Sequence, residues 1–298
     1  MHKQQNHQHM IIIDLSNLLY LSLYSSMKLN QKKVPVLKDI RIILLNKIQD
    51  SRARLKQEFG EETIISVDSN SWRKDVFKGY KHKRKKTRDE DDLDWKVIHG
   101  YFSELEEELR SNSSYKVIKV NGAEADDTIA ILSLLSKKTQ DPVVIVGRDK
   151  DFFQLHSIPK LRQFDPNNNQ FIDVIIEEIP YNLFTHICRS EVSDGIPSII
   201  SDINSFVTGT RQKPLRQTYI TEAFNYAKQG KLEDFLGPER YKRFQENKTL
   251  VDFRMVPEVV KTNILNAYNT YEVKENNMFN YLIEHGIVEN FKNVLKNF

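Results

Sequence analysis

The chain has 298 residues, of which 39% are hydrophobic and 29% are charged, and its formal net charge is +3. This composition is that of a globular protein with one large domain or two smaller ones. The single cysteine, Cys188, excludes a disulfide framework and a cysteine-based zinc site, and suits a reducing cytoplasm. We expect neither a signal peptide nor a membrane span, because residues 1–10 are polar and Asp14, Ser16 and Asn17 interrupt the apolar run that follows.

Short apolar runs alternate with amphipathic segments in the first part of the chain. Residues 10–13 predict a buried strand, and residues 15–23 continue with the apolar spacing of a helix. A longer amphipathic helix is predicted at 36–59, with Gly60 as its stop. A second buried strand is predicted at 64–67.

A basic segment, residues 72–88, follows the second strand. Trp72, Phe77 and Tyr80 are interleaved with its cations, which favours contact with a nucleic acid over a merely solvated surface, because single strands are held by stacking and by neutralised phosphates. Gly79 and the density of like charges disfavour a packed helix, so we expect an excursion over the strand ends. The cations are Arg73, Lys74, Lys78, Lys81, Lys83, Arg84, Lys85, Lys86 and Arg88.

An acidic stretch, Glu124-Ala125-Asp126-Asp127, marks the next strand-to-helix turn. A charged helix is predicted at 95–109, a strand at 115–120 and a helical run at 128–135. Carboxylates this close repel one another unless a cation or hydrogen-bond donors compensate. Acids also stabilise helix N-termini, so capping alone is the competing interpretation.

A fourth strand, predicted at 143–146, leads to Asp149 and Asp151. On an extended chain these two side chains point to the same side, so that both can face one cation. A strand pair is predicted at 161–164 and 171–175, joined by a Pro-Asn-Asn-Asn turn.

Strands alternating with helices predict an α/β fold, with a mainly parallel central sheet and helices on both faces. Ligands bind such sheets beyond the carboxyl ends of the strands. Acids without histidine or cysteine partners suit Mg²⁺ or Mn²⁺, and two such ions about 4 Å apart can hydrolyse a phosphodiester. The absence of a Walker-type loop argues against a nucleotide-driven motor. Four predicted strands deliver acids to that edge, although each alone could be a helix cap: Asp14, Asp68, Glu124, Asp126, Asp149 and Asp151.

Beyond residue 180 helical spacing dominates, which predicts a helical second domain. Residues 182–187 and 199–206 are predicted helices on either side of an acidic turn, and residues 208–216 form a basic loop. Amphipathic helices that pack the core are predicted at 259–271 and 278–298.

The order and spacing of these motifs resemble the 5′ nuclease superfamily of flap endonucleases and 5′-3′ exonucleases, most closely its T-even phage ribonuclease H branch. The resemblance runs from about residue 10 to the last helices. It implies a PIN-like nuclease core at 10–180 with a helical arch at 70–94, and a helical DNA-binding domain at 181–298 with a helix-three-turn-helix element. The motifs are Ile11-Ile12-Ile13-Asp14, Asp68 ahead of Trp72-Arg73-Lys74-Asp75, Glu124-Ala125-Asp126-Asp127, Asp149-Lys150-Asp151-Phe152 and the turn from Glu191 to Pro197.

The resemblance also implies an activity. The expected enzyme hydrolyses phosphodiester bonds 5′ to 3′ in RNA–DNA and DNA duplexes, cuts 5′ flaps and removes RNA primers during phage DNA replication in the host-cell cytoplasm. Two Mg²⁺ ions, replaceable by Mn²⁺, are the implied cofactors. The implied partners are branched or nicked DNA, RNA–DNA duplex, a single-strand-binding protein and a sliding clamp, with no membrane and a monomeric chain.

Matching the motifs position by position assigns roles to individual residues. The first metal falls to Asp14, Asp68, Glu124, Asp126 and Asp149, with Asp127 beside them, and the second to Asp151, Glu191 and Asp194. Catalysis is assigned to Asp14, Asp68 and Asp126, together with Lys81 and Arg73 at the scissile phosphate. Nucleic-acid contacts are assigned to Arg73, Lys74, Tyr80, Lys81 and Arg84, and by charge alone to Lys213 and Arg216.

The acidic turn departs from the family pattern, because Ser190 and Ser198 replace glycines and Glu191 replaces an aspartate. The lost glycines weaken the expectation of close backbone approach to a phosphate and of a monovalent-ion site there. Two alternatives remain open. A DNA-junction-binding protein of the same fold without catalysis is disfavoured by the retained acids, which are costly beside DNA without a metal. A topoisomerase-primase type site or a small single-domain ribonuclease explains neither the basic segment nor the helical domain.

Overall fold

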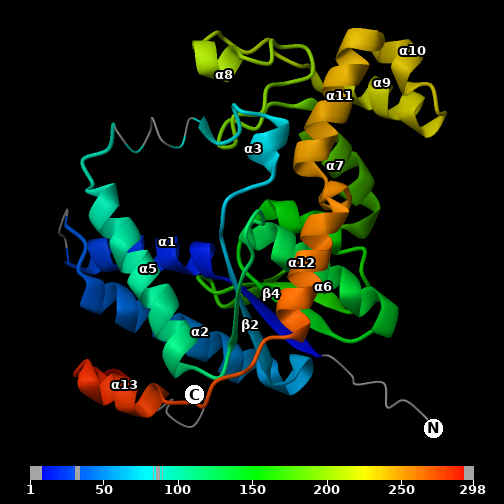
Figure 1. Ribbon diagram of the computed structural model, residues 1–298. Helices are drawn as coiled ribbons and strands as arrows, with labels where there is room; N and C mark the ends of the chain where they lie inside the picture. The colour runs from blue at the N-terminus through cyan, green and yellow to red at the C-terminus, as the bar shows by residue number, and fades with distance from the viewer. Residues whose placement is uncertain (1–8, 31–33, 83, 85–87, 89, 292–298) are drawn as a thin grey trace, which may run out of the picture. The chain divides into compact units, whose positions relative to one another are not determined.

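The structure is a computed structural model, and it describes residues 9–30, 34–82, 84, 88 and 90–291 (Figure 1). Its chain forms two compact units, each built from segments that are distant in sequence. The sheet unit consists of Met1–Asn70, Leu93–Val174 and Glu258–Phe298, and the helical unit of Ser71–Asp92 and Ile175–Pro257. Along the described ranges, no helix is both long enough and apolar enough to span a bilayer.

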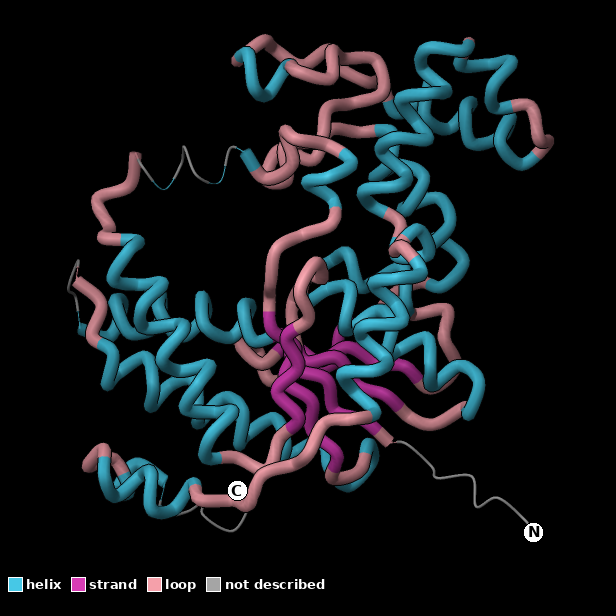
Figure 2. Tube along the Cα trace, viewed as in Figure 1, coloured by secondary structure: helices cyan, strands magenta, loops and turns pink. Residues whose placement is uncertain are grey.

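A six-stranded sheet forms the centre of the sheet unit, with the strand order β3-β2-β1-β4-β5-β6 (Figure 2). All neighbouring pairs are parallel except β5 and β6, which are antiparallel. This topology confirms the predicted α/β class with a mainly parallel sheet. Parallel strands are buried on both faces, which is why their sequences are continuous apolar runs. The strands are β1 (Met10–Asp14), β2 (Glu62–Val67), β3 (Lys116–Lys119), β4 (Val143–Val146), β5 (Leu161–Asp165) and β6 (Gln170–Ile172).

Helices cover both faces of this sheet, with α2 and α5 on one side and α6 and α12 on the other (Figure 1). Gly60 stops α2 as predicted and has a φ of 79°. The elements are α1 (Leu15–Asn30), α2 (Leu37–Phe59), α5 (Trp95–Asn112), α6 (Ala125–Thr139), α12 (Glu258–Asn269) and α13 (Met278–Glu284), with 3-10 segments η1 (Lys150–Leu155) and η4 (Val288–Phe291).

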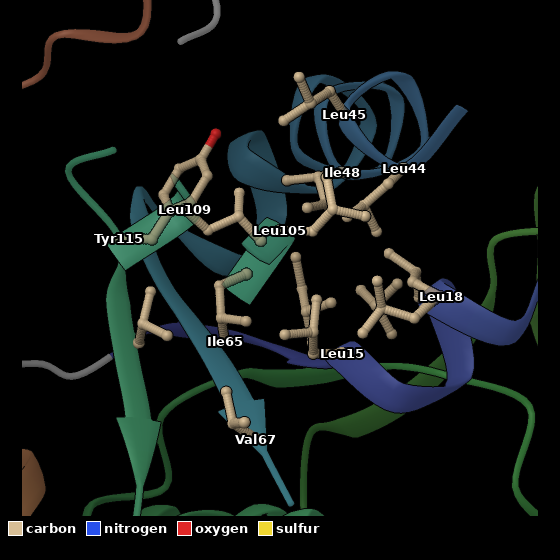
Figure 3. Close-up of a cluster of buried hydrophobic side chains, with 14 of the residues drawn as sticks. Leu15, Leu18, Leu44, Leu45, Ile48, Ile65, Val67, Leu105, Leu109 and Tyr115 are labelled. Atoms are coloured by element: carbon tan, nitrogen blue, oxygen red, sulfur yellow. The ribbon is translucent and has the colours of Figure 1, made fainter. Parts of the chain in front are cut away.

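The largest core lies between the sheet and helices α1, α2 and α5 (Figure 3). Ile65 and Val67 of β2 face this core, and Leu44 and Ile48 of α2 pack in it with Leu105 of α5. Burying each such side chain contributes about 1.5–3 kcal/mol. This packing holds the strands, and therefore their carboxyl ends, in fixed register.

The helical unit packs around a second apolar cluster that includes Phe184, Ile187, Cys188 and Phe244. Phe77 from the beginning of the basic segment belongs to the same cluster. The elements are α3 (Arg73–Val76), η2 (Ile176–Glu178), α7 (Ile179–Cys188), α8 (Ser205–Thr208), α9 (Gln217–Lys228), α10 (Leu232–Leu236), α11 (Pro238–Val251) and η3 (Phe253–Met255).

The units differ from the predicted domains in two places. The residues of the predicted arch between 71 and 92 pack with the helical unit, and its residues 83, 85–87 and 89 lie outside the described residues. The last helices pack with the sheet unit. Tyr268 of α12 donates a hydrogen bond to Glu62 Oε2 at 2.9 Å, and Tyr281 of α13 donates one to Glu108 Oε2 at 2.5 Å.

The second helix predicted beside the acidic turn, at 199–206, is replaced by turns followed by the four-residue helix α8. Polar side chains compete with helical hydrogen bonding in this stretch. Asp202 Oδ1 accepts a hydrogen bond from Asn204 N at 2.8 Å, and the hydroxyls of Ser198 and Ser201 are 2.8 Å apart. Such local side-chain hydrogen bonds favour turns over a regular helix.

Candidate functional site

Three neighbouring strands bring carboxylates to one edge of the sheet. Asp14 is the last residue of β1, Asp68 follows β2, and Asp149 follows β4. Because β1 lies between β2 and β4 and all three are parallel, their carboxyl ends share one edge. Asp14 is 5% exposed, and its Oδ1 accepts a hydrogen bond from Asn17 N at 3.1 Å.

The electrostatics at Asp14 show that these carboxylates act on one another. Burial raises the pKa of Asp14 to about 7, and the negative charges of Asp68 and Asp149 add to the rise. Backbone N–H groups of Asn17 and Ser16 partly offset it. A buried carboxyl near like charges is stabilised either by a proton or by a cation.

Asp68 joins the starts of two helices. Its Oδ1 accepts a hydrogen bond from Ala125 N, the first residue of α6, at 2.8 Å. Its Oδ2 accepts one from Ser16 Oγ, in the first turn of α1, at 2.5 Å. Both helices therefore begin at the edge where the strands end, and Asp68 is fixed between them.

The acidic stretch after β3 forms a capping box at the start of α6. Glu124 N donates to Asp127 Oδ2 at 3.0 Å, and the Glu124 side chain accepts from the backbone N–H of Asp127. Both side chains are buried, whereas Asp126 in the first turn is half-buried. The capping interpretation thus holds for Asp127. Glu124 and Asp126 remain candidates for the metal, because a capping carboxylate keeps lone pairs that can bind an ion.

The expectation that Asp149 and Asp151 lie on an extended chain is wrong. Lys150 begins the 3-10 segment η1, and Asp149 caps it by accepting a hydrogen bond from Asp151 N at 2.8 Å. Gly147, which precedes this turn, lies against Asp14, since a Cβ at Gly147 would be 3.2 Å from Asp14 Cβ. The turn after β4 is therefore packed directly on the β1 carboxylate.

Sequence reasoning missed three residues near this edge, two in β5 and one in the turn after β4. Gln163 is buried, and its amide contacts the backbone of the turn that carries Asp149. Arg148 Nε lies 3.2 Å from Oδ2 of the buried Asp165. Their signal in the sequence is the placement of Gln163 and Asp165 two residues apart in a predicted strand, since side chains at that spacing share a face and a buried polar side chain needs a partner.

The donor set fits a hard divalent cation. It consists of carboxylate oxygens that repel one another, at a sheet edge, without cysteine or histidine. Among the described residues, no three histidine, cysteine, aspartate or glutamate side chains already surround one point as metal ligands would. A cation at this edge would offset the burial of the Asp14 carboxylate and its repulsion by Asp68 and Asp149, the two causes of its raised pKa.

The predicted acids of the helical unit have partners within that unit. Asp194 accepts hydrogen bonds from Arg84 Nη2 at 2.6 Å and from the Tyr80 hydroxyl at 3.2 Å, and its carbonyl accepts one from Lys81 N at 2.8 Å. Gly195 lies so close to the basic segment that a Cβ on Gly195 would be 2.8 Å from Gly79 O. The acidic turn and the middle of the basic segment, residues 79–81 and 84, are thus in direct contact and hydrogen-bonded to each other.

Glu191 also has a nearby partner, a histidine that is cationic when it is protonated. His186 Nε2 lies 3.4 Å from Glu191 Oε2, an ion-pair distance, and the Ser193 hydroxyl donates to Oε1 at 2.7 Å. These groups, His186 foremost, lower the pKa of Glu191 to about 2. Glu191 therefore carries its charge without needing a metal ion.

The predicted nucleic-acid contacts fall into two kinds. Arg73 is 3% exposed, donates from Nε to Leu250 O at 2.8 Å and lies 4.7 Å over the Trp72 ring, so contact with a phosphate would require it to leave this site. The residues that are exposed or half-buried are Lys74, Lys81, Arg84, Lys213 and Arg216, whereas the ring of Tyr80 is buried.

Two family descriptions together cover the chain from residue 9 to its end. Residues 9–178 match the 5′-3′ exonuclease, N-terminal resolvase-like domain, and residues 176–298 match T4 RNase H, C terminal. Ribonuclease H of Enterobacteria phage T4 is 28% identical over 258 residues, which are 83% of each chain. Flap endonuclease Xni of Shewanella sp. (strain MR-4) is 35% identical over 107 residues, which are 36% of this chain and 37% of the relative.

Solved structures of two bacteriophage T5 nuclease chains show the same fold. A T5 flap endonuclease in a complex with DNA and metal ions superposes with a TM-score of 0.56 and 16% identity, covering 88% of this chain and 99% of that one. The T5 5′-exonuclease with bound zinc has a TM-score of 0.57 and 15% identity, over 88% of this chain and 99% of that one.

Proposed function

The chain belongs to the 5′-3′ exonuclease family, and from that premise we propose that it is a Mg²⁺-dependent 5′ nuclease that degrades DNA and RNA–DNA duplexes from the 5′ end and cuts 5′ flaps. One observation carries the proposal: Asp14, Asp68 and Asp149 arrive from adjacent parallel strands, and the pKa of Asp14 is raised to about 7. The phage T4 relative, named a ribonuclease H, supports the inclusion of RNA–DNA duplexes and a role in removing RNA primers.

In this proposal the sheet unit holds the divalent ion through Asp14, Asp68 and Asp149, with Glu124 and Asp126 completing the set. A bound Mg²⁺ would supply a water activated for attack and charge stabilisation at the phosphodiester, and Mn²⁺ has compatible ligand preferences. The chain itself orients the ligands. Asn17 N fixes Asp14, while Ser16 Oγ and Ala125 N fix both oxygens of Asp68.

A second ion is part of the proposal, with Asp151 as its candidate ligand in the sheet unit. The assignment of Glu191 and Asp194 to that ion stays a prediction, and their partners His186 and Arg84 argue against it. Calorimetric titration of the full chain with Mn²⁺ tests the number of ions. One ion per chain removes the second ion from the proposal.

Exposed and half-buried cations of the helical unit are proposed to bind the nucleic-acid backbone. Lys74 and Lys81 belong to the segment that begins the predicted arch, and Lys213 and Arg216 to the basic loop. Lys81→Ala should reduce turnover while leaving the affinity for the metal unchanged, and it should reduce the slope of log affinity against log salt by about 1. Equal loss of metal affinity would contradict the role given to Lys81.

The decisive experiment uses 5′-labelled flap, nicked and RNA–DNA duplexes with and without Mg²⁺. Asp126→Ala should abolish cleavage and retain substrate binding. Asp173→Ala is the matched control: Asp173 is exposed and follows the antiparallel β6, so it lies at the opposite edge of the sheet. A wild-type chain that binds these duplexes and cleaves none with Mg²⁺ or Mn²⁺ would instead be the catalytically inactive junction-binding protein.

A further inference from the structure

Gln163 on β5 holds the turn that follows β4 through its side chain. It is 0% exposed, and its Nε2 donates hydrogen bonds to Gly147 O at 2.9 Å and to Asp149 O at 2.8 Å. These two carbonyls flank Arg148 in the turn after β4. The amide therefore holds both ends of the short segment that places Asp149.

The third hydrogen bond of this amide follows from the first two. The two carbonyls need donors, which fixes Nε2 on their side, and the amide oxygen Oε1 accepts a hydrogen bond from His156 Nε2 at 3.1 Å. The proton of His156 is therefore on Nε2. Because His156 directly follows η1, the amide links that segment, the turn and β5.

This link acts on a carboxylate that has little packing of its own. Asp149 is exposed and its Oδ1 accepts a hydrogen bond from Asp151 N at 2.8 Å, so the direction of its side chain depends on the backbone of this turn. The same backbone approaches Asp14, because a Cβ at Gly147 would be 3.2 Å from Asp14 Cβ. A shift of the turn after β4 would change the separation of the two carboxylates.

We propose that Gln163 is a positioning residue for the metal site, which fixes the backbone of residues 147–149 so that Asp149 and Asp14 face the same divalent cation. The proposal rests on the proposed function, because it needs an ion at the sheet edge. A purely structural role would satisfy the carbonyls of Gly147 and Asp149 without affecting metal binding. Groups that orient metal ligands typically contribute 10–100-fold in metal affinity or activity.

The test replaces Gln163 without adding charge. Gln163→Met keeps a similar length and removes both donors, and Gln163→Asn keeps an amide that is one methylene too short to reach both carbonyls. Mn²⁺ is titrated into the full chain by calorimetry, and the Mg²⁺ concentration for half-maximal flap cleavage is measured in parallel. We expect the dissociation constant to rise about 10–100-fold in Gln163→Met and less in Gln163→Asn.

Gln49→Met is the matched control. Gln49 is also 0% exposed, and its Nε2 donates to the Tyr115 hydroxyl at 2.7 Å. Tyr115 precedes β3, so this hydrogen bond lies toward the amino ends of the parallel strands. The control loses a buried amide of the same kind and should bind Mn²⁺ like the wild type.

The outcomes separate the two proposals. Wild-type affinity in both Gln163 variants would overturn the positioning role and leave the proposed function intact. A rise in Gln49→Met equal to that in Gln163→Met would also overturn it, because the effect would then come from general loosening. If Gln163→Met does not fold, Gln163→Asn carries the same comparison. A wild-type chain that binds no divalent ion would overturn the proposed function itself.

Discussion

The acids of the two units face opposite electrostatic surroundings. In the sheet unit, burial and the charges of Asp68 and Asp149 raise the pKa of Asp14 to about 7. In the helical unit, His186 and Ser193 lower the pKa of Glu191 to about 2. Both residues belong to the acidic motifs that resemble the family pattern. The ionised form of Asp14 is disfavoured by its surroundings, whereas that of Glu191 is favoured.

The difference shows where a cation would contribute free energy. Asp194 is paired with the cation Arg84 and Glu191 lies beside His186, so a metal ion would have to displace Arg84 or His186. Asp14 lies near two like charges, so an ion there would relieve repulsion. The proposed principal metal site therefore lies on the sheet unit, and the following predictions test this comparison.

The largest effect is expected from Asp14→Asn. Cleavage of a 5′ flap should fall by more than about 100-fold, because even residues that only orient a metal ligand contribute 10–100-fold. Substrate binding, measured by fluorescence anisotropy without metal, should be retained. Cleavage within a few-fold of the wild type would remove Asp14 from the site.

Metal binding should stabilise the fold through the sheet unit. At a Mg²⁺ concentration 100 times its dissociation constant, the free energy of unfolding should increase by about 2.7 kcal/mol, and EDTA should reverse the gain. Urea unfolding of Asp14→Asn and Glu191→Gln separates the two regions. The gain should disappear in Asp14→Asn and persist in Glu191→Gln, and its loss in Glu191→Gln would show that Glu191 binds the ion.

In the absence of metal ions, removal of the Asp194 carboxylate should destabilise the protein. In Asp194→Ala, the Tyr80 hydroxyl and the Arg84 guanidinium lose the hydrogen bonds that they donate to this carboxylate. The free energy of unfolding should fall by about 1–2 kcal/mol. Asp173→Ala, an exposed acid on the other unit, serves as the control and should change it by less than about 0.5 kcal/mol.

The smallest effect concerns acid pH. Because the pKa of Glu191 is lowered to about 2, its charge stabilises the fold above the ordinary pKa of 4.5, and this contribution is lost as the pH falls toward 2. Solvent screening of the partly exposed pair limits it to less than about 1 kcal/mol. Glu191→Gln should therefore be less stable than the wild type at pH 6 and equal to it near pH 2. A difference that is independent of pH would assign the effect to packing.

Local sequence patterns predicted the elements of the sheet unit well. The β-branched runs at residues 10–13, 64–67 and 143–146 became β1, β2 and β4, because an apolar run of this length is buried most readily as a strand. Asp14, Asp68 and Asp149 were recognisable as candidates because each lies where one of these apolar runs ends. The pattern failed at residues 199–206, where polar side chains that bond locally prevented the predicted helix.

The sequence by itself determined which residues form strands, and that Asp14, Asp68 and Asp149 follow their ends. Only the tertiary structure decided that β1 lies between β2 and β4, that Arg73 is buried, and that the amide of Gln163 holds the turn of Asp149. The physical reason is the range of the interactions. Strand formation depends on neighbours in the chain, whereas strand order, burial and hydrogen bonds between strands depend on segments that meet only when the chain folds.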